Sequence, residues 1–192
     1  MSDPYVYPGT GVLRNKLGIQ DAEKLDYYER EIVTMRVGEG IPSGNFDLQH
    51  LKAIHRHLFQ DIFEWAGQIR TVEISKGGSQ FQFQQYIETG MADVHRRLMK
   101  SDFLRGLEQS VFAAEAGKII GDVNYVHPFR EGNGRTQLLY LKQLAEQAGH
   151  PLDLTKIEAA GWLAASKEAH RARYDLMGQV IGDALRRTPP TV

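Results

Sequence analysis

Nine consecutive residues, from His127 to Arg135, bring together the side-chain types that phosphate chemistry needs, in the order His-Pro-Phe-Arg-Glu-Gly-Asn-Gly-Arg. A histidine has an intrinsic pKa suited to taking a proton from an incoming hydroxyl group. Glu131 adds a hard oxygen, of the kind that binds Mg²⁺ together with substrate phosphates. The stretch therefore pairs a candidate general base with a candidate metal ligand.

The second half of the same stretch is typical of an anion-binding loop. Gly132, Asn133 and Gly134 lead directly into an expected helix. Glycines let successive backbone N–H groups point inward, and a helix N-terminus adds partial positive charge. Arg135 adds a planar, permanently charged donor. A plain glycine turn beside a chance arginine would be the structural alternative, but base, carboxylate, glycines and arginine within nine residues favour a nucleotide site.

Composition excludes several other classes of protein. The 192 residues are 42% hydrophobic and 24% charged, which fits one globular domain. Lys and Arg number 23 against 24 Asp and Glu, so no overall field attracts nucleic acid or anionic lipid. The absence of cysteine excludes a disulfide framework, a zinc ribbon and thiol catalysis. With no membrane-length apolar run and no signal peptide pattern, we expect a cytoplasmic protein without direct nucleic-acid or membrane partners.

Helical spacing dominates the rest of the chain. Residues 20–36 repeat apolar side chains every three or four positions, namely Ala22, Leu25, Tyr28, Ile32 and Met35. Asp47 is expected to cap the next helix, and Thr155 with Glu158 is expected to form a capping box for a later one. Between residues 69 and 84 the period changes to alternation on both sides of Lys76-Gly-Gly78, which predicts one β-hairpin. We therefore expect an all-α domain with a single hairpin.

Other conspicuous residues have structural explanations. His50, His55 and His57 share a helix, but their spacing does not stack ligands on one face, so we expect His55 to be a hydrogen-bonded core residue. The remaining expectations are Trp65 and Trp162 as core anchors and Gly117 and Gly121 as points of close helix packing.

The stretch 127–135 resembles the signature of Fic-domain proteins, His-x-Phe-x-Asp/Glu-Gly-Asn-Gly-Arg-x-x-Arg. Every position matches except the last, which is Leu138. The helix 47–65 followed by Ala-Gly resembles the one that precedes the family's flap, and residues 69–84 resemble the flap itself. The resemblance implies a Fic fold, a helical bundle around a central motif-bearing helix pair with one β-hairpin flap. It places the Fic domain at 45–187, after a lead-in and first helix (1–44) and before a tail (188–192).

The resemblance also implies an activity, the transfer of AMP from ATP to a hydroxyl side chain of a target protein. His127 would be the general base, Phe129 would support the loop, and Glu131 would bind Mg²⁺ between the α- and β-phosphates. The implied nucleotide-binding residues are Gly132, Asn133, Gly134 and Arg135, with Lys76 and Gly77 of the flap. The flap would also hold an extended segment of the target by strand addition.

Two departures from the family pattern shape the expected function. Leu138 cannot neutralise the γ-phosphate, which leaves three alternatives. Arg14, Lys76 or Arg171 takes that role, or the protein favours another nucleotide, or it is a degenerate nucleotide-binding or partner-binding module with weak or no transferase activity.

The second departure concerns control. The family's inhibitory motif, Ser/Thr-x-x-x-Glu-Gly/Asn, has no clean match, because Thr34 is followed by a glutamate one residue too late. The family pattern then implies a toxin silenced by a small separate antitoxin. By family analogy, the targets would be the ATPase subunits of DNA gyrase and topoisomerase IV.

Overall fold

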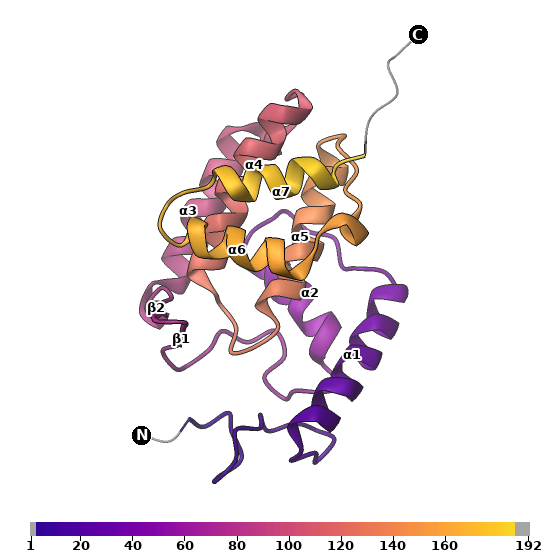
Figure 1. Ribbon diagram of the computed structural model, residues 1–192, viewed down its shortest axis with the longest axis vertical. Helices are drawn as coiled ribbons and strands as arrows, with labels where there is room; N and C mark the ends of the chain where they lie inside the picture. The colour runs from indigo at the N-terminus through magenta and orange to yellow at the C-terminus, as the bar shows by residue number, and fades with distance from the viewer. Residues whose placement is uncertain (1–2, 187–192) are drawn as a thin grey trace.

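The computed structural model describes residues 3–186, and within them it shows seven α-helices and one two-stranded antiparallel sheet (Figure 1). The α-helices are α1 (Ala22–Gly38), α2 (Leu48–Phe59), α3 (Ile87–Lys100), α4 (Gln109–Val126), α5 (Asn133–Gln147), α6 (Ala159–Ala169) and α7 (Asp175–Ala184). The strands are β1 (Ser75–Lys76) and β2 (Ser79–Gln80). The prediction of an all-α domain with one hairpin is confirmed. The tail expected at residues 188–192 lies outside the described residues.

None of the helices found between residues 3 and 186 has the length and apolar character that crossing a bilayer requires.

Helix α4 is the centre of the bundle and packs against α3, α5, α6 and α7. Two glycines allow this close approach. A Cβ on Gly117 would lie 2.7 Å from the main-chain nitrogen of Gly178 in α7, and one on Gly121 would lie 2.7 Å from the ring of Tyr174. The predicted close packing at both glycines is confirmed, and it holds α4 close to α7 and to Tyr174 just before it.

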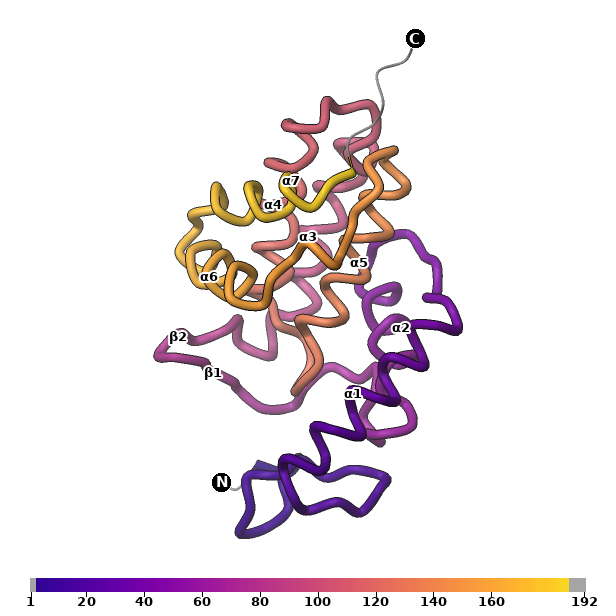
Figure 2. The backbone as a smooth tube through the Cα atoms, turned by 45° about the vertical axis from the view of Figure 1, so that its right-hand side comes forward, coloured from indigo at the N-terminus to yellow at the C-terminus, as the bar shows by residue number. Residues whose placement is uncertain are grey.

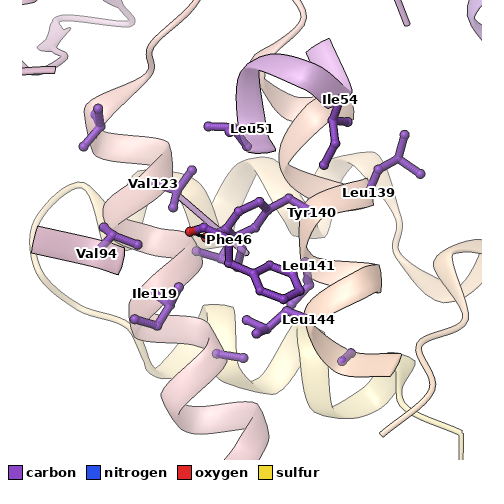
Figure 3. Close-up of a cluster of buried hydrophobic side chains, with 14 of the residues drawn as sticks. Phe46, Leu51, Ile54, Val94, Ile119, Val123, Leu139, Tyr140, Leu141 and Leu144 are labelled. Atoms are coloured by element: carbon purple, nitrogen blue, oxygen red, sulfur yellow. Dashed lines mark hydrogen bonds between the residues drawn. The ribbon is translucent and has the colours of Figure 1, made fainter. Parts of the chain in front are cut away.

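The hydrophobic core fixes α5 against the start of α2 (Figure 3). The Tyr140 hydroxyl donates a 2.7 Å hydrogen bond to the main-chain oxygen of Phe46, and both side chains are buried. Leu51 of α2 and Leu144 of α5 are among the residues packed around this pair. Because the stretch 127–135 leads into α5, this packing sets the position of the candidate site relative to α2.

Helix α1 packs against α2 through a face that differs from the predicted one. Leu25 is buried as expected from helical spacing, and so is Val33, which was not among the predicted residues. Tyr28 and Met35 were predicted on the same apolar face but are 43% and 55% exposed, so this part of the prediction is wrong. The buried position between Leu25 and Val33 is occupied by Glu29, because an arginine of α5 faces it.

The two predicted helix caps had different outcomes. The Asp47 carboxylate accepts a hydrogen bond from the N–H of His50 at 2.8 Å, so this cap is confirmed. The capping box of Thr155 and Glu158 is wrong. Helix α6 begins one residue after Glu158, which makes no side-chain cap. Asp153 is closer to Thr155 and accepts hydrogen bonds from both its N–H and its hydroxyl in a preceding 3-10 turn.

The hairpin forms the tip of the flap (residues 69–84) and projects from the bundle at the end where the loop joining α4 to α5 lies (Figure 2). Its turn is Gly77-Gly78, and both residues have positive φ angles, 57° and 81°, as two-residue hairpin turns require. The predicted hairpin is confirmed, but its strands are only two residues long. The legs of the flap, meaning its residues on either side of these strands, form hydrogen bonds to other parts of the fold.

Candidate active site

His127 lies directly after α4 with its main chain in the left-handed region, at φ 48°. Its Nδ1 atom lies 3.0 Å from the main-chain oxygen of Asn124. A carbonyl oxygen can only accept a hydrogen bond, so Nδ1 carries the proton. The other ring nitrogen, Nε2, therefore keeps its lone pair and is available as a proton acceptor.

The surroundings of His127 favour its neutral form. Burial lowers the pKa of its imidazole to about 4, and the positive charges of Arg70, Lys76 and His170 act in the same direction. The hydrogen bond at Nδ1 opposes this shift only partly. At neutral pH the ring is therefore an uncharged base. The ring of Phe81 from the flap stacks on it, with centroids 3.8 Å apart and 17° between the planes.

The loop that follows His127 (residues 127–135, the motif loop) is held by reciprocal hydrogen bonds. The Phe129 N–H donates to Oδ1 of Asn133 at 3.0 Å, and Nδ2 of Asn133 donates to the Phe129 oxygen at 2.7 Å. His55 stacks on the Phe129 ring at 3.9 Å and bonds the main-chain oxygen of Glu131 at 3.0 Å. Its Nδ1 accepts from the N–H of Gly67. The prediction of His55 as a hydrogen-bonded core residue is confirmed, and it ties α2 to the loop.

The end of the motif loop has the backbone features of an anion-binding site. Gly132 has φ 81°, and a Cβ there would lie 2.5 Å from the ring of Phe59, so no other residue fits. The next three N–H groups, at the first turn of α5, have no acceptor within the helix. A Cβ on Gly134 would meet open space, so the main chain is accessible on that side. This arrangement can bind phosphate oxygens by backbone donors and helix polarity.

The Arg135 guanidinium is held on several sides. It lies 4.8 Å from the centroid of the Phe59 ring and forms an ion pair with Glu29 of α1. A second carboxylate, that of Glu131, is 3.8 Å away. Neither Glu29 nor Phe59 was predicted as a site residue. The only sequence signal for Glu29 is a charge at the buried position between Leu25 and Val33.

Glu131 fits the kind of carboxylate that Mg²⁺ takes together with substrate phosphates. Its side chain is half-exposed, and Oε1 accepts a hydrogen bond from the N–H of Gly132 at 2.9 Å. In the described part of the chain, no group of three or more His, Cys, Asp or Glu side chains could hold a metal alone. A cation here would therefore take ligands from the nucleotide, which is the usual habit of Mg²⁺.

The remaining residues to which the sequence analysis gave a role are those of the flap tip, Leu138 and its possible substitutes. Lys76 and Gly77 are exposed at the flap tip. Leu138 is half-buried and does not belong to the core cluster. Two of the basic residues considered as its substitutes have other partners. Arg14 donates to the main-chain oxygen of Val6, and Arg171 pairs with a glutamate at 3.2 Å.

Comparison with known proteins gives the class of protein. Residues 45–145 match the model of the Fic/DOC family, so the chain belongs to that family, as the resemblance predicted. It is 42% identical to the probable protein adenylyltransferase y4lH of Sinorhizobium fredii over 85% of each chain. It is 40% identical to the protein adenylyltransferase VbhT of Bartonella schoenbuchensis, covering 94% of this chain and 38% of VbhT.

The fold has close counterparts among solved structures. The BepC protein of Bartonella tribocorum, solved with bound AMPPNP, superposes with a TM-score of 0.88 at 27% identity. The similarity covers 96% of this chain and 97% of that one. The predicted Fic fold is confirmed.

Proposed function

We propose that this protein is a protein adenylyltransferase that moves AMP from ATP to a hydroxyl side chain of a target protein. Relatives that match most of the chain are protein adenylyltransferases by name, which supports the enzyme class. A structural neighbour binds an ATP analogue. The observation within the site that carries the proposal is the tautomer of His127, which leaves Nε2 free as a proton acceptor in the loop that leads into α5.

In this reaction, Nε2 of His127 accepts the hydroxyl proton while the hydroxyl oxygen bonds to the α-phosphorus. The bond from that phosphorus to the bridging oxygen of the β-phosphate breaks, and pyrophosphate leaves. The backbone of Gly132, Asn133 and Gly134 binds the phosphates, and Arg135 neutralises the β-phosphate. Phe129 keeps the loop in shape from the core.

Magnesium is part of this proposal. Glu131 would hold Mg²⁺, which when bound offsets negative charge on the α- and β-phosphates.

The flap is the proposed docking site of the target. A two-stranded hairpin leaves strand edges that an extended segment can join by main-chain hydrogen bonds. Lys76 and Gly77 lie at its tip, where they would contact the nucleotide and the docked segment. Docking in this way would hold the target hydroxyl in line with the α-phosphorus.

The test compares ATP labelled on the α-phosphate with ATP labelled on the γ-phosphate, in a cell lysate with Mg²⁺ or with a chelator. We expect protein labelling from the α-position only, and only with Mg²⁺. His127→Ala should reduce it by roughly two to four orders of magnitude, on the scale of a lost general base. Full activity of His127→Ala would contradict the mechanism, and γ-label transfer would indicate a kinase.

A second candidate function rests on Leu138, which leaves the γ-phosphate without the family's arginine. The protein would then be a Fic-fold module that binds a nucleotide or a partner with weak or no transfer. This second function would be indicated if the protein binds AMPPNP in a titration but labels no protein in the experiment above.

The biological role that we propose is that of a cytoplasmic toxin with a small separate antitoxin. The absence of a clean inhibitory motif in the given sequence supports this role. Purified ATPase subunits of DNA gyrase and topoisomerase IV are the first targets to test in place of the lysate. Labelling of neither subunit would reject this target class while leaving the transferase activity open to other substrates.

A further inference from the structure

Arg70, at the base of the flap, is a charged residue whose side chain has no exposure to solvent, 0%. It is one of the largest fully buried side chains of the protein. A guanidinium carries five N–H donors, and burying it is costly unless acceptors are in place for them. The acceptors around Arg70 therefore indicate which parts of the fold depend on it.

Those acceptors are main-chain oxygens from three separate segments. Nε donates to His127 at 2.9 Å, and Nη1 donates to Val72 at 2.8 Å. Nη2 donates to Gln82 and, at 3.4 Å, to Val126. Val72 and Gln82 lie on opposite legs of the flap, and His127 carries the candidate base. A single buried side chain thus joins both legs of the flap to the end of α4.

Further bonds complete this attachment. The Glu73 carboxylate lies 3.4 Å from Nη1 of Arg70 and accepts the N–H of Gln84 on the other leg. The N–H of Gln82 donates to the main-chain oxygen of Tyr125 in α4. The legs of the flap are therefore bonded to Arg70 and α4 as well as to each other, through the N–H of Phe81 and the main-chain oxygen of Ile74.

The attachment also affects the position of His127, the candidate general base. Phe81 precedes Gln82 in the chain, and its ring stacks on the His127 ring at 3.8 Å. Arg70 bonds the main chain on both sides of this stack, at Gln82 and at His127. One guanidinium thus bonds the flap and the base together, in addition to the main-chain bonds from Gln82 to Tyr125 and from the N–H of Arg70 to Pro128.

We propose that Arg70 is a positioning residue that holds the flap and His127 in one fixed relation, so that a target hydroxyl docked on the flap meets the base. This inference rests on the proposed function, because it assigns the target to the flap and the base to His127. Arg70 contacts neither nucleotide nor target in this account and acts through the main chain of the two elements.

Two substitutions test the proposal. Arg70→Met keeps much of the volume without donors or charge. Arg70→Lys keeps the charge, but its three donors radiate from one atom and cannot reach three separate carbonyls. The matched control is Arg36→Lys, since Arg36 also forms ion pairs, with Asp61 and Glu39, but touches neither the flap nor the motif loop.

Activity and exchange should change selectively in both Arg70 variants. We expect amide hydrogen exchange to accelerate at least about tenfold in residues 71–83 and to stay unchanged in α5. Affinity for AMPPNP with Mg²⁺ should fall by no more than about fivefold, because the motif loop would hold the phosphates and only Lys76 and Gly77 of the flap would contact the nucleotide. Transfer of AMP to target should fall by about 100-fold in kcat/KM, the scale for a misplacement of about 1 Å. The control should change none of these.

A titration of the His127 ring by NMR gives a readout that does not need activity. The pKa of about 4 comes mainly from burial, with Arg70, Lys76 and His170 as the charged groups that face the ring. Release of the flap would expose the ring, so its pKa should rise towards the ordinary value of about 6.5 in Arg70→Lys, which keeps the positive charge, so that the rise cannot come from loss of that charge. If the unaltered protein transfers no label, the proposed function fails, and exchange and titration still decide the role of Arg70.

Two results would overturn the proposal. One is unchanged flap exchange and unchanged His127 titration in both Arg70 variants. The other is accelerated exchange throughout the molecule with a parallel loss of AMPPNP affinity, which would make Arg70 a general brace. If Arg70→Met does not fold, Glu73→Gln replaces it, because Glu73 is a partly exposed partner. The same selective pattern, smaller in size, is expected there, and its absence would reject the proposal.

Discussion

The Arg135 guanidinium is paired with the Glu29 carboxylate, which α1 brings to the start of α5 and leaves only 10% exposed. Glu29 and Glu131 thus flank Arg135, which we propose as the ligand of the β-phosphate. Any nucleotide must share that guanidinium with two carboxylates. Helix α1 therefore belongs to the site, although it lies before the stretch that matches the family.

Glu29→Gln should strengthen nucleotide binding. The amide keeps a hydrogen-bond acceptor for Arg135 but removes the charge that competes with phosphate. We expect AMPPNP to bind about three- to fivefold more tightly, on the scale of a partly exposed ion pair. Calorimetric titration measures this, with Glu31→Gln on the exposed side of the same helix as the control. Weaker binding in Glu29→Gln would instead mean that the carboxylate is needed to orient Arg135.

The pH dependence of transfer should report the stack of Phe81 on His127. In the intact protein the lowered pKa keeps the base neutral down to about pH 4, so transfer should be nearly constant from about pH 5.5 to 8. Phe81→Ala exposes the ring and raises its pKa towards about 6.5, so activity should be lost as the pH falls below that value. Phe83→Ala is the control, because Phe83 is exposed and stacks on no ring of the site. Parallel profiles for all three proteins would show that the stack does not set the pKa.

The flap edge should be needed for the target but not for the nucleotide. The register pairs Lys76 with Ser79 beside the turn and Ser75 with Gln80 beyond it, so the N–H of Ser75 faces away from the partner strand. Ser75→Pro removes this donor without breaking the hairpin ladder, whereas Ser75→Ala keeps it. We expect the proline variant alone to lose target labelling while AMPPNP affinity is unchanged. Equal loss of both would make the hairpin a structural brace.

Helix packing gives a prediction on stability. A Cβ on Gly117 would meet the main chain of Gly178, which cannot rotate away, so Gly117→Ala should lower the free energy of unfolding by about 1–3 kcal/mol. Gly161→Ala is the control, because a Cβ there meets open space in α6 and should leave stability unchanged or raise it by up to about 1 kcal/mol. Urea unfolding of both variants measures the difference. Equal effects would mean that α4 and α7 can separate without strain.

The features that could be predicted from sequence are those with a local signature. Asp47 caps α2 because a short acidic side chain before a helix accepts its free N–H groups, and Gly77-Gly78 marks the turn because only glycine adopts both angles easily. Arg70 has no such signature. Its partners are main-chain oxygens, which any residue supplies, and arginine is exposed in most proteins. Glu29 was missed for a related reason, since a glutamate on a helix is ordinarily a surface residue.

Leu138 offers the most direct test of nucleotide selection. It is half-buried, lies one helical turn after Arg135, and is outside the core cluster, so an arginine there can extend from α5 without opening a cavity. In the intact protein the γ-phosphate has no arginine at this position, and ATP and ADP should bind with similar affinity. Leu138→Arg should favour ATP by about 1.5–3 kcal/mol, the range for a charge-assisted hydrogen bond, and should raise AMP transfer.

Leu138→Gln separates charge from size in this experiment, because it is comparably long but neutral and should leave ATP and ADP equivalent. Calorimetric titration of both nucleotides with Mg²⁺ into the three proteins gives the comparison. A strong preference for ATP in the intact protein would show that another basic residue already binds the γ-phosphate. Lys76 would then be the first candidate, since it is exposed on the flap and its charge acts on His127, whereas Arg14 and Arg171 have other partners. In that case, Lys76→Met should abolish the preference of the otherwise unaltered protein for ATP over ADP.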